Sequence, residues 1–519
     1  MRKVISRQEA AALVQDGMTL GMLGFVTLSV PEELLVSLEE RFLAEGHPRD
    51  LNVFYTSAIG DGGEHGANHL AHAGLVRRMV GAHVGLAPKL NPLITGNQIE
   101  TFCAPQGVLV HMCRAMAGHK CGVITHVGLK TFCDPEVEAC CFNDAARKAH
   151  TEGRGIVQSI EIDGRLLHYK LTPPDVCFIK ATYGDSRGNL SMEKEGLFLE
   201  QLEMALATKN NGGTVIAQVD TLVEDNTLDP RSVKVHGCFV DYVVVGRPEY
   251  SRQHYFDAIP YHPEWTGEVR VPMGALEPME LGIRKIIARR GAMELRRECL
   301  VNLGFGMPDG VASVAGEEGV AGEMTLSIES GTLGGVPAPG NGCGASADVE
   351  AIVKHTEIFD GYDGGSIDIA YLGAAQIDRH GNVNVSKFAG RMTGPGGFIN
   401  ITQNAKKICF MGTFSSVKDT DIRLENGRLN IVKDSNVVKF VPEVEQITFS
   451  GDYGAGGIPP DRPRPDPRGG GPRRGAGAGH LSTDGLPACC GCRSERDGSA
   501  NFSPGKNGAC APGLRGKTR

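Results

Sequence analysis

The stretch LSIESGTLGG, residues 326–335, places one carboxylate where an apolar run gives way to a loop with little side-chain bulk. Glu329 follows the apolar run, and Ser330, Gly331, Gly334 and Gly335 come after it. Glycine has no Cβ, so such a loop lets another group's backbone approach closely. Three interpretations are open: a surface glutamate at a turn, a metal ligand, or a nucleophile. The loop offers no Asp, Glu or His at helpful spacing for a metal site, which disfavours the second.

A carboxylate nucleophile attacks an activated acyl carbon and divides one difficult acyl transfer into two easier steps. It must stay ionised and must face backbone N–H donors that hold the developing oxyanion. A second glycine loop, MTGPGGFINI at 392–401, could supply those donors. Taken alone, its glycines at 394–397 fit a plain turn equally well.

The elements that must position these loops alternate along the chain. Short β-branched runs at 176–181, 214–219 and 241–246 are separated by helical patterns. The pattern at 30–42 predicts a helix with Pro31 in its first turn and its leucines on one face. Alternating strands and helices predict an α/β fold with a largely parallel sheet.

The motif Asp-x-x-Gly-Asn occurs twice, beginning at Asp185 and at Asp378, and each copy is followed by a further strand at the same offset. Each copy predicts a tight turn in which Asp bonds the local backbone and Gly takes a positive φ. We therefore predict two related doubly wound α/β domains, at 1–260 and 275–451. The boundary is expected in the Pro- and His-rich segment 255–272.

Residues 452–519 are rich in Gly, Pro and Arg and contain neither valine nor methionine. Such a segment cannot bury enough apolar surface to offset its ordering entropy, so we expect a disordered tail. Its composition is also that of GC-rich DNA translated in the wrong frame. A frameshift after about Gly451 and a genuine appendage are both open.

Composition limits the class of protein. A chain of 519 residues is long enough for two or more domains, and 41% apolar with 22% charged residues is typical of a soluble globular protein. A net charge of −8 argues against nucleic-acid binding. We expect no membrane association and a cytoplasmic location, since no apolar run or export signal is present. The 15 scattered cysteines fit reduced thiols.

Together these features resemble the family I coenzyme A transferases, of the fused type that carries both halves in one chain. The resemblance rests on E-x-G-x-x-G from Glu329, GPGGF at 394–398, Pro-Gln-Gly at 105–107 and the two-fold repeat. It covers about residues 2–450 and is greatest to the acetate, propionate and 3-oxoacid enzymes of the family. The combination of motifs is specific, whereas each motif alone is weak.

The resemblance implies that Glu329 attacks an acyl-CoA thioester and becomes an acyl-glutamyl anhydride. The departing thiolate then gives a glutamyl-CoA thioester, and a second acid reverses the steps, in a ping-pong reaction. It further implies that the N–H groups of Gly397 and Phe398 bind the oxyanion or substrate carboxylate, and that Gln106 is a side-chain donor. A thioester suits a carboxylate nucleophile without an obvious base, because a thiolate leaves readily.

The CoA contacts are less defined, since the chain has neither a Walker loop nor a dinucleotide fingerprint. Gly396, Lys387 and Arg391 are candidates, and for the two cations a solvated surface is the competing interpretation. CoA is a substrate here, and neither a cofactor nor a metal is called for. The resemblance implies acetate, propionate, butyrate or a 3-oxoacid as acceptor, and a homodimer or homotetramer.

Two other functions stay open: an acyl-CoA hydrolase on the same scaffold, and a catalytically inactive CoA-binding protein. Three histidines, His65, His69 and His72, have a spacing that would place them near one helix face, which is metal-like. Glycines interrupt that segment, and a loop near the active site is the competing interpretation.

Overall fold

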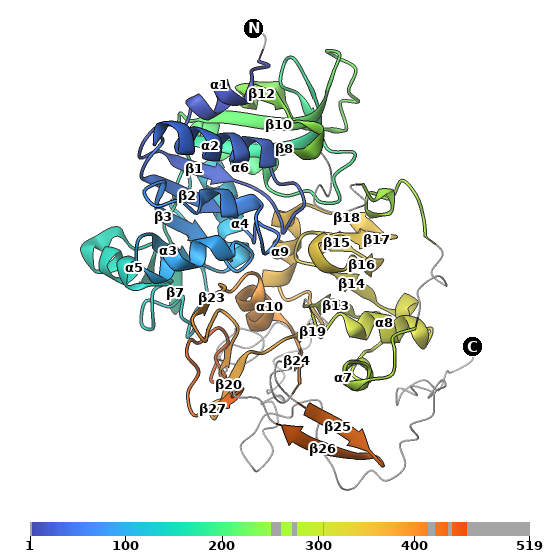
Figure 1. Cartoon of the computed structure of the whole chain (residues 1–519). Helices are drawn as coiled ribbons and strands as arrows, with labels where there is room; N and C mark the ends of the chain where they lie inside the picture. Colours follow the sequence, from blue (N-terminus) through green and yellow to red (C-terminus); the bar gives the residue numbers. More distant parts are fainter. Residues whose placement is uncertain are drawn as a thin grey trace. The chain divides into compact units, whose positions relative to one another are not determined.

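The computed structural model describes residues 3–250, 261–271, 278–304, 306–413, 421–433 and 438–453 (Figure 1). Contacts divide the chain into two compact units. The first comprises Met1–Val271, Ile328–Gly364 and Ser386–Ile401, and the second comprises Pro272–Ser327, Gly365–Val385 and Thr402–Arg519. The predicted tail, from residue 454 on, and part of the predicted boundary segment lie outside the described residues.

These compact units are not consecutive stretches of chain. The first unit takes up Ile328–Gly364 and Ser386–Ile401, which come from the second half of the sequence. Two consecutive domains at 1–260 and 275–451 therefore stay a prediction about the repeat. The grouping matters for function, because it places both glycine loops in the first unit.

A nine-stranded sheet forms the centre of the first unit. Its parallel part runs in the order β12-β10-β8-β1-β2-β3-β4. These strands are β1 (Thr19–Met22), β2 (Leu51–Tyr55), β3 (Val76–Gly81), β4 (Glu100–Cys103), β8 (Val176–Asp185), β10 (Thr214–Val223) and β12 (Tyr242–Val245). Strand β9 (Leu190–Ser191) pairs antiparallel with β8, and β11 (Val233–Val235) with β9. Chain order reverses between β1 and β8, so the sheet is doubly wound with its switch point there.

The helix predicted at 30–42 is confirmed as α2 (Glu32–Glu45), with Pro31 as its N-cap. It ends at Gly46, which has a φ of 70° and so suits glycine. Helix α1 (Arg7–Ala12) packs on α2, and α4 (Gln106–Ala117) packs on α6 (Gln201–Asn210). Two short helices, α3 (Asn91–Thr95) and α5 (Asp144–Ala149), and an antiparallel sheet of β5 (Val123–Thr125), β7 (Arg165–Tyr169) and β6 (Val157–Glu161) complete this part.

The second unit repeats the winding with fewer strands. Its parallel strands run in the order β14-β13-β19-β24. They are β13 (Leu300–Leu303), β14 (Thr325–Ser327), β19 (Ile369–Leu372) and β24 (Ile408–Phe410). Helix α8 (Gly310–Glu317) packs on α7 (Ile283–Ala292). Gly282 is the N-cap of α7 and is still extended, with a φ of −162°.

Both copies of the predicted Asp-x-x-Gly-Asn turn are present. Asp185 Oδ1 accepts the Asn189 N–H at 2.9 Å, and Gly188 has a φ of 89°. In the second copy Asp378 Oδ1 accepts the Asn382 N–H at 3.0 Å, and the turn glycine again has a positive φ. The repeat is therefore a structural one, and the predicted α/β class with parallel sheets is confirmed.

Shorter elements make up the rest of the described chain. In the first unit they are β15 (Thr332–Leu333), β16 (Val336–Pro337), β17 (Ser346–Ala347), β18 (Ala351–Ile352), α9 (His355–Asp363), β22 (Lys387–Phe388) and β23 (Arg391–Met392). Helix α10 (Phe398–Asn404) follows β23. The second unit adds β20 (Gln376–Asp378), β21 (Val383–Asn384), β25 (Asp421–Glu425), β26 (Arg428–Lys433) and β27 (Phe440–Val441). Within the described ranges, no helix has both the length and the apolar character needed to cross a bilayer.

Candidate active site

Glu329 lies in a tight turn that directly follows β14. The Gly331 N–H donates to the Ile328 carbonyl at 3.0 Å, so Glu329 occupies the first of the two central positions. Gly331 has a φ of +109°, and a Cβ there would lie 2.2 Å from the Val353 carbonyl oxygen. Only glycine fits this position. The glycine therefore packs the turn against the neighbouring strand and holds the partly buried Glu329 at the corner.

The second glycine loop is held against the residues that follow β3. The Val84 N–H donates to the Thr393 carbonyl at 2.7 Å, and the Gly396 N–H donates to the Ala82 carbonyl at 3.0 Å. Gly394 has a φ of +92°, and a Cβ on it would lie 2.5 Å from the Ala82 carbonyl oxygen. The loop therefore lies against the carboxyl end of a parallel strand, where doubly wound folds place their ligands.

The two glycine-rich segments meet at Glu329. A Cβ placed on Gly397 would lie 3.4 Å from both the carboxyl carbon and Oε1 of Glu329. The carboxylate thus stands at van der Waals distance from a backbone that has no side chain to shield it. Within the described chain the Gly397 N–H makes no hydrogen bond. The Phe398 N–H closes a turn on the Pro395 carbonyl at 3.0 Å, so its predicted role as a donor requires that bond to open.

Gln106 lies beside the same loop, although it is far away in sequence. It follows β4 as the first residue of α4, and its N–H donates to the Gly396 carbonyl at 3.0 Å. The next residue, Gly107, donates its N–H to Asn400 Oδ1 at 3.1 Å. A Cβ on Gly107 would lie 2.5 Å from Asn400 Nδ2. The Pro-Gln-Gly motif thus lets α4 begin directly against the second glycine loop.

The candidate CoA-binding cations are on the hairpin that leads into this loop. Lys387 on β22 pairs with Met392 on β23, and the Met392 N–H donates to Asn91 Oδ1 at 3.2 Å. Lys387 is half-buried and Arg391 is exposed. Gly396 adjoins Gln106, whose Oε1 is 3.7 Å from where a Cβ on Gly396 would be. Phosphate binding by Lys387 and Arg391 stays a prediction.

Sequence reasoning missed three buried polar residues at this site: His355, Glu200 and Asn400. Gln106 Nε2 lies 3.0 Å from Nε2 of His355, whose other ring nitrogen pairs with Glu200. Asn400 Nδ2 donates to Asp363 Oδ1 at 2.8 Å. Asn400 stands two residues after the GPGGF motif and could have been singled out as a loop anchor. The other two carry no local signal, because each partner is distant in sequence.

His83 was also missed, and it lies in the segment that anchors the second glycine loop. Burial lowers the pKa of His83 to about 4, so the ring is neutral near pH 7. The Gly85 N–H donates to its Nδ1 at 3.2 Å, which leaves the hydrogen on Nε2. A neutral imidazole beside the loop adds no charge that would compete with the Gly397 amide for an anion.

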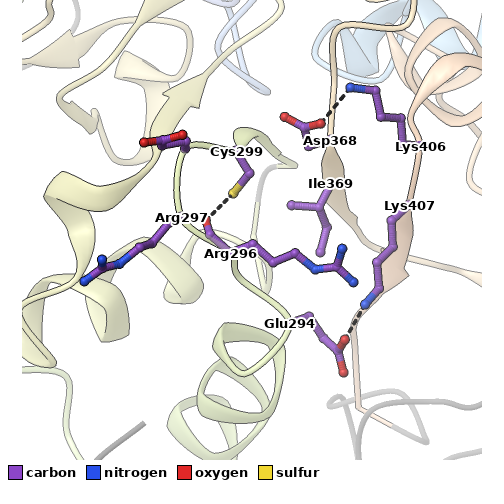
Figure 2. Close-up of a pocket in the computed structure, with 9 residues that line it drawn as sticks. Glu294, Arg296, Arg297, Cys299, Asp368, Ile369, Lys406 and Lys407 are labelled. Atoms are coloured by element: carbon purple, nitrogen blue, oxygen red, sulfur yellow. Dashed lines mark hydrogen bonds and ion pairs between the residues drawn. The ribbon is translucent and has the colours of Figure 1, made fainter. Parts of the chain in front are cut away.

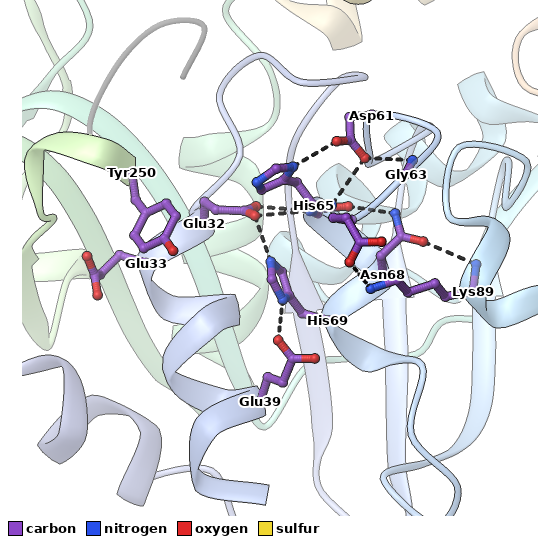
Figure 3. A network of polar contacts seen from close by, with 12 residues as sticks. Glu32, Glu33, Glu39, Asp61, Gly63, His65, Asn68, His69, Lys89 and Tyr250 are labelled. Carbon is purple, nitrogen blue, oxygen red and sulfur yellow. Dashed lines mark hydrogen bonds and ion pairs between the residues drawn. The ribbon is translucent and has the colours of Figure 1, made fainter. Parts of the chain in front are cut away.

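Each of the three histidines weighed as metal ligands contacts an acidic side chain, and Figure 3 shows these contacts for His65 and His69. His69 on the short helix after His65 contacts Glu32 at 2.7 Å and also Glu39, both from α2. His72 contacts Glu39 at 2.6 Å, and His65 contacts Asp61 at 2.7 Å. In the described residues no group of three potential ligands has a geometry that could hold a metal ion. The network instead joins the 61–72 segment to α2.

Burial opposes a charge on His69, but its hydrogen bonds to Glu32 and Glu39 outweigh that effect and raise the pKa of His69 to about 9. His69 is therefore an imidazolium at neutral pH. Glu32 also accepts the Gly66 N–H at 3.0 Å. The charge is thus used to hold a loop on a helix.

One cavity of about 370 Å³ lies in the second unit (Figure 2). It is lined by residues that precede β13, β19 and β24, among them Cys299, Asp368 and Lys407. Lys406 pairs with Asp368 at 2.7 Å, and Lys407 pairs with Glu294. These residues mark the amino ends of parallel strands, whereas Glu329 follows a carboxyl end. The charges largely neutralise one another, and the cavity has no part in the glycine-loop site.

A second cavity, of about 270 Å³, lies in the first unit beside the Glu329 turn. Its lining includes Phe198, Leu202, Lys234, Val353 and Lys354. Val353 is the residue whose carbonyl faces Gly331, and its N–H donates to the Gly331 carbonyl at 2.9 Å. The lining is mainly apolar, and its two lysines are balanced by Glu203 and Glu357, so the cavity has no excess of positive charge.

Comparison with known proteins supports the sequence-based expectation. Residues 4–246 match the family model described as Coenzyme A transferase. The chain is 42% identical to the caffeate CoA-transferase of Acetobacterium woodii, over 88% of this chain and 86% of that one. It is 36% identical to the acetate CoA-transferase YdiF of Escherichia coli O157:H7, over 86% of this chain and 83% of that one.

The fold agrees with solved structures of the same relative. The crystal structure of acyl-CoA transferase (YdiF) apoenzyme from Escherichia coli O157:H7 has a TM-score of 0.80. It is 36% identical in sequence, and the match covers 87% of this chain and 84% of that one. A thioester complex of YdiF with CoA matches with the same TM-score.

Proposed function

Because this chain belongs to the coenzyme A transferase family and is a transferase that acts on acyl-CoA and carboxylic acids, we propose that Glu329 is its nucleophile. The observation that carries the proposal is the approach of the Glu329 carboxylate to the bare backbone of Gly397, at 3.4 Å from a Cβ position. The contact joins two glycine-rich loops that are distant in sequence, as a shared active site requires.

In the first step, a Glu329 oxygen attacks the thioester carbon, and the carbonyl oxygen becomes an oxyanion. The Gly397 N–H, which has no partner within the described chain, is the donor that we assign to it. The C–S bond then breaks, and CoA leaves as a thiolate, so that an acyl-glutamyl anhydride remains. The thiolate attacks the glutamyl carbonyl of the anhydride and releases the first acid as a carboxylate.

The enzyme then holds CoA as a glutamyl-CoA thioester on Glu329. A second carboxylate attacks this thioester and runs the same bond changes in reverse. We assign the binding of the acid's carboxylate to the Gln106 side chain, which adjoins Gly396. Acetate, propionate, butyrate and 3-oxoacids are the proposed acceptors, and caffeate joins them because the A. woodii relative is a caffeate CoA-transferase.

The test compares wild type with Glu329→Gln and with Glu350→Gln, a control at an exposed acid of the same loop region. After addition of acyl-CoA, the wild-type chain should gain CoA covalently. Hydroxylamine should convert Glu329 to a hydroxamate that peptide mass spectrometry locates. Glu329→Gln should lose transfer by at least about 10³-fold, and Glu350→Gln should keep it. Unchanged transfer by Glu329→Gln, or a label elsewhere, contradicts the proposal.

The same experiment separates the two other functions. Without an acceptor acid, a hydrolase would release free thiol from acyl-CoA continuously, whereas a transferase would release one equivalent of the first acid per site and keep the CoA bound to Glu329. An inactive CoA-binding protein would acquire no label. Varying the acceptor over the five acids at fixed acyl-CoA then ranks the substrates by kcat/KM, and parallel double-reciprocal lines support the ping-pong order.

A further inference from the structure

Behind Gln106 lies a chain of buried polar side chains that the reaction steps above do not use. Gln106 Nε2 is 3.0 Å from His355 Nε2, and His355 Nδ1 pairs with Glu200 Oε1. Glu200 Oε2 accepts the Thr56 hydroxyl at 3.0 Å. The exposed fraction is 0% for His355 and Glu200, 1% for Thr56 and 2% for Gln106. All four residues belong to the first compact unit.

Each of these four residues comes from a different element of the fold. Thr56 follows the carboxyl end of β2, and Gln106 follows that of β4. Glu200 is the N-cap of α6, and His355 is the first residue of α9. The His355 N–H also donates to the Phe198 carbonyl at 2.9 Å. This backbone contact holds the first residue of α9 close to the residues that precede Glu200.

With the Gln106 amide oriented as in the structure, the contacts of His355 indicate one arrangement of its ring hydrogen. A carboxylate only accepts, so the His355 Nδ1 that faces Glu200 carries a hydrogen. The Gln106 amide nitrogen only donates, so the His355 Nε2 that faces it carries none. In this arrangement the hydrogen of the His355 ring is on Nδ1. In the alternative tautomer, with the hydrogen on Nε2, His355 would donate to the Gln106 side-chain oxygen. The Gln106 amide would then have to be rotated by 180°.

We propose that Glu200 and His355 are positioning residues that orient the Gln106 amide for the substrate carboxylate. Glu200 sets the tautomer of His355, and His355 takes up one of the two amide hydrogens. The second hydrogen and Oε1 are then held in one orientation beside Gly396. The same logic operates where a carboxylate orients a metal-bound histidine. The proposal deepens the assignment of Gln106 above and rests on it.

Packing around His355 supports a positioning role and makes the test feasible. Its ring lies edge-on to Phe25, with ring centres 5.9 Å apart, and tilted to Phe359 at 5.3 Å. An apolar cage of this kind excludes water, so the ring nitrogens have only Gln106 and Glu200 as partners among the residues that the structure describes. The variant Glu200→Gln keeps shape but removes the charge that selects the tautomer.

The first measurement is independent of catalysis. Nitrogen-15 histidine spectra of the full chain should contain an Nδ1–H tautomer signal that disappears in His355→Phe. Glu200→Gln should convert that signal to a mixture with the Nε2–H tautomer. Glu203→Gln is the matched control, because Glu203 is on the same helix and pairs with Lys354 at 3.2 Å without contacting His355. An Nε2–H or doubly protonated His355 in the wild type overturns the proposal.

The second measurement is a double-mutant cycle on kcat/KM for the acceptor acid. Glu200→Gln should lower kcat/KM by about tenfold or more when Gln106 is present, and by less than about twofold in a Gln106→Ala background. Purely structural damage would add in both backgrounds, and additivity would refute the proposal. If Glu329→Gln keeps full transfer, the nucleophile assignment falls, yet the histidine spectrum still decides the tautomer.

Discussion

At the scale of single residues, the site depends on which glycines face backbone and which face the nucleophile. Gly397 lies outside the left-handed region of φ, and a Cβ on it would meet only the carboxylate of Glu329 and one methyl group of Ile401, at 3.4 Å. Gly394, three residues earlier, has a φ of +92° and would press a Cβ to 2.5 Å from the Ala82 carbonyl. The two positions should therefore fail in different ways when alanine is introduced.

Gly397→Ala should lower transfer by about 10²-fold, because the methyl group crowds Glu329 and the oxyanion position. Its thermal unfolding midpoint should stay within a few degrees of wild type. Gly394→Ala should instead lose about 1–3 kcal/mol of unfolding free energy through backbone strain. Calorimetry and transfer assays on both variants check this. If Gly397→Ala and Gly394→Ala lose the same unfolding free energy, the proposed difference between the two glycines is wrong.

The sequence allowed the residues within one motif to be predicted, but not those that meet across motifs. Glu329 was singled out from its loop and Gly397 and Gln106 from the resemblance of their motifs to a family, and they do lie together. His355 and Glu200 were missed because a lone buried histidine and a lone glutamate have no distinguishing neighbours. Their pairing depends on how α6 and α9 pack, and packing of that kind is not encoded in spacing along the chain.

At the scale of elements, α2 is joined to the 61–72 segment by charge. Burial disfavours the imidazolium of His69, but contacts with Glu32 and Glu39 raise its pKa to about 9 from an unfolded value of about 6.5. Because the pKa of His69 is higher in the folded state, its charged form stabilises the fold fully below about pH 6.5. That stabilisation is lost as the pH rises through about 9. The shift corresponds to at most about 3 kcal/mol.

His69→Gln should therefore unfold more easily than wild type near pH 6, by up to about 3 kcal/mol in urea titrations. The gap should narrow steadily above pH 7 and be small by about pH 10. His47→Gln is the control, since His47 forms an exposed pair with Asp16 at 2.9 Å and should cost under about 1 kcal/mol. A gap that is constant with pH would show that the charge of His69 does not matter.

The way in which these elements pack also explains why the bounds of the compact units could not be predicted from the sequence. Alternation of strands and helices identified two related halves, and both parallel sheets were found. The segments Ile328–Gly364 and Ser386–Ile401 come from the second half of the sequence but group with the first unit. One of their contacts is at Gly394, where the backbone approaches the backbone of Ala82 and leaves no hydrophobic period to detect.

At the scale of the whole molecule, the repeat identifies an element that the second copy lacks within the described residues. The Gly237 N–H donates to Asn189 Oδ1 at 2.9 Å, and the Gly451 N–H donates to Asn382 Oδ1 at 3.0 Å, so these glycines correspond. After Gly237 the chain forms β12, which pairs with β10. In the described part of the second unit, β24 has β19 as its one neighbour and ends the sheet.

The sequence after Tyr453 reads GAGGIPPDRP and has no run comparable to Tyr242–Val245. An unpaired edge strand exposes its N–H and C=O groups and favours association. We therefore predict that one of the two other reading frames after codon 451 encodes a β-branched run at the place that corresponds to β12. A chain with that frame restored should unfold several degrees higher, because a paired edge strand adds buried area and hydrogen bonds. Deleting residues 454–519 without adding a strand should leave the thermal unfolding midpoint nearly unchanged, so this control separates the gain of a strand from the loss of a tail. If neither of the other frames encodes an apolar run, or if restoring the frame leaves the unfolding midpoint unchanged, the frameshift is excluded.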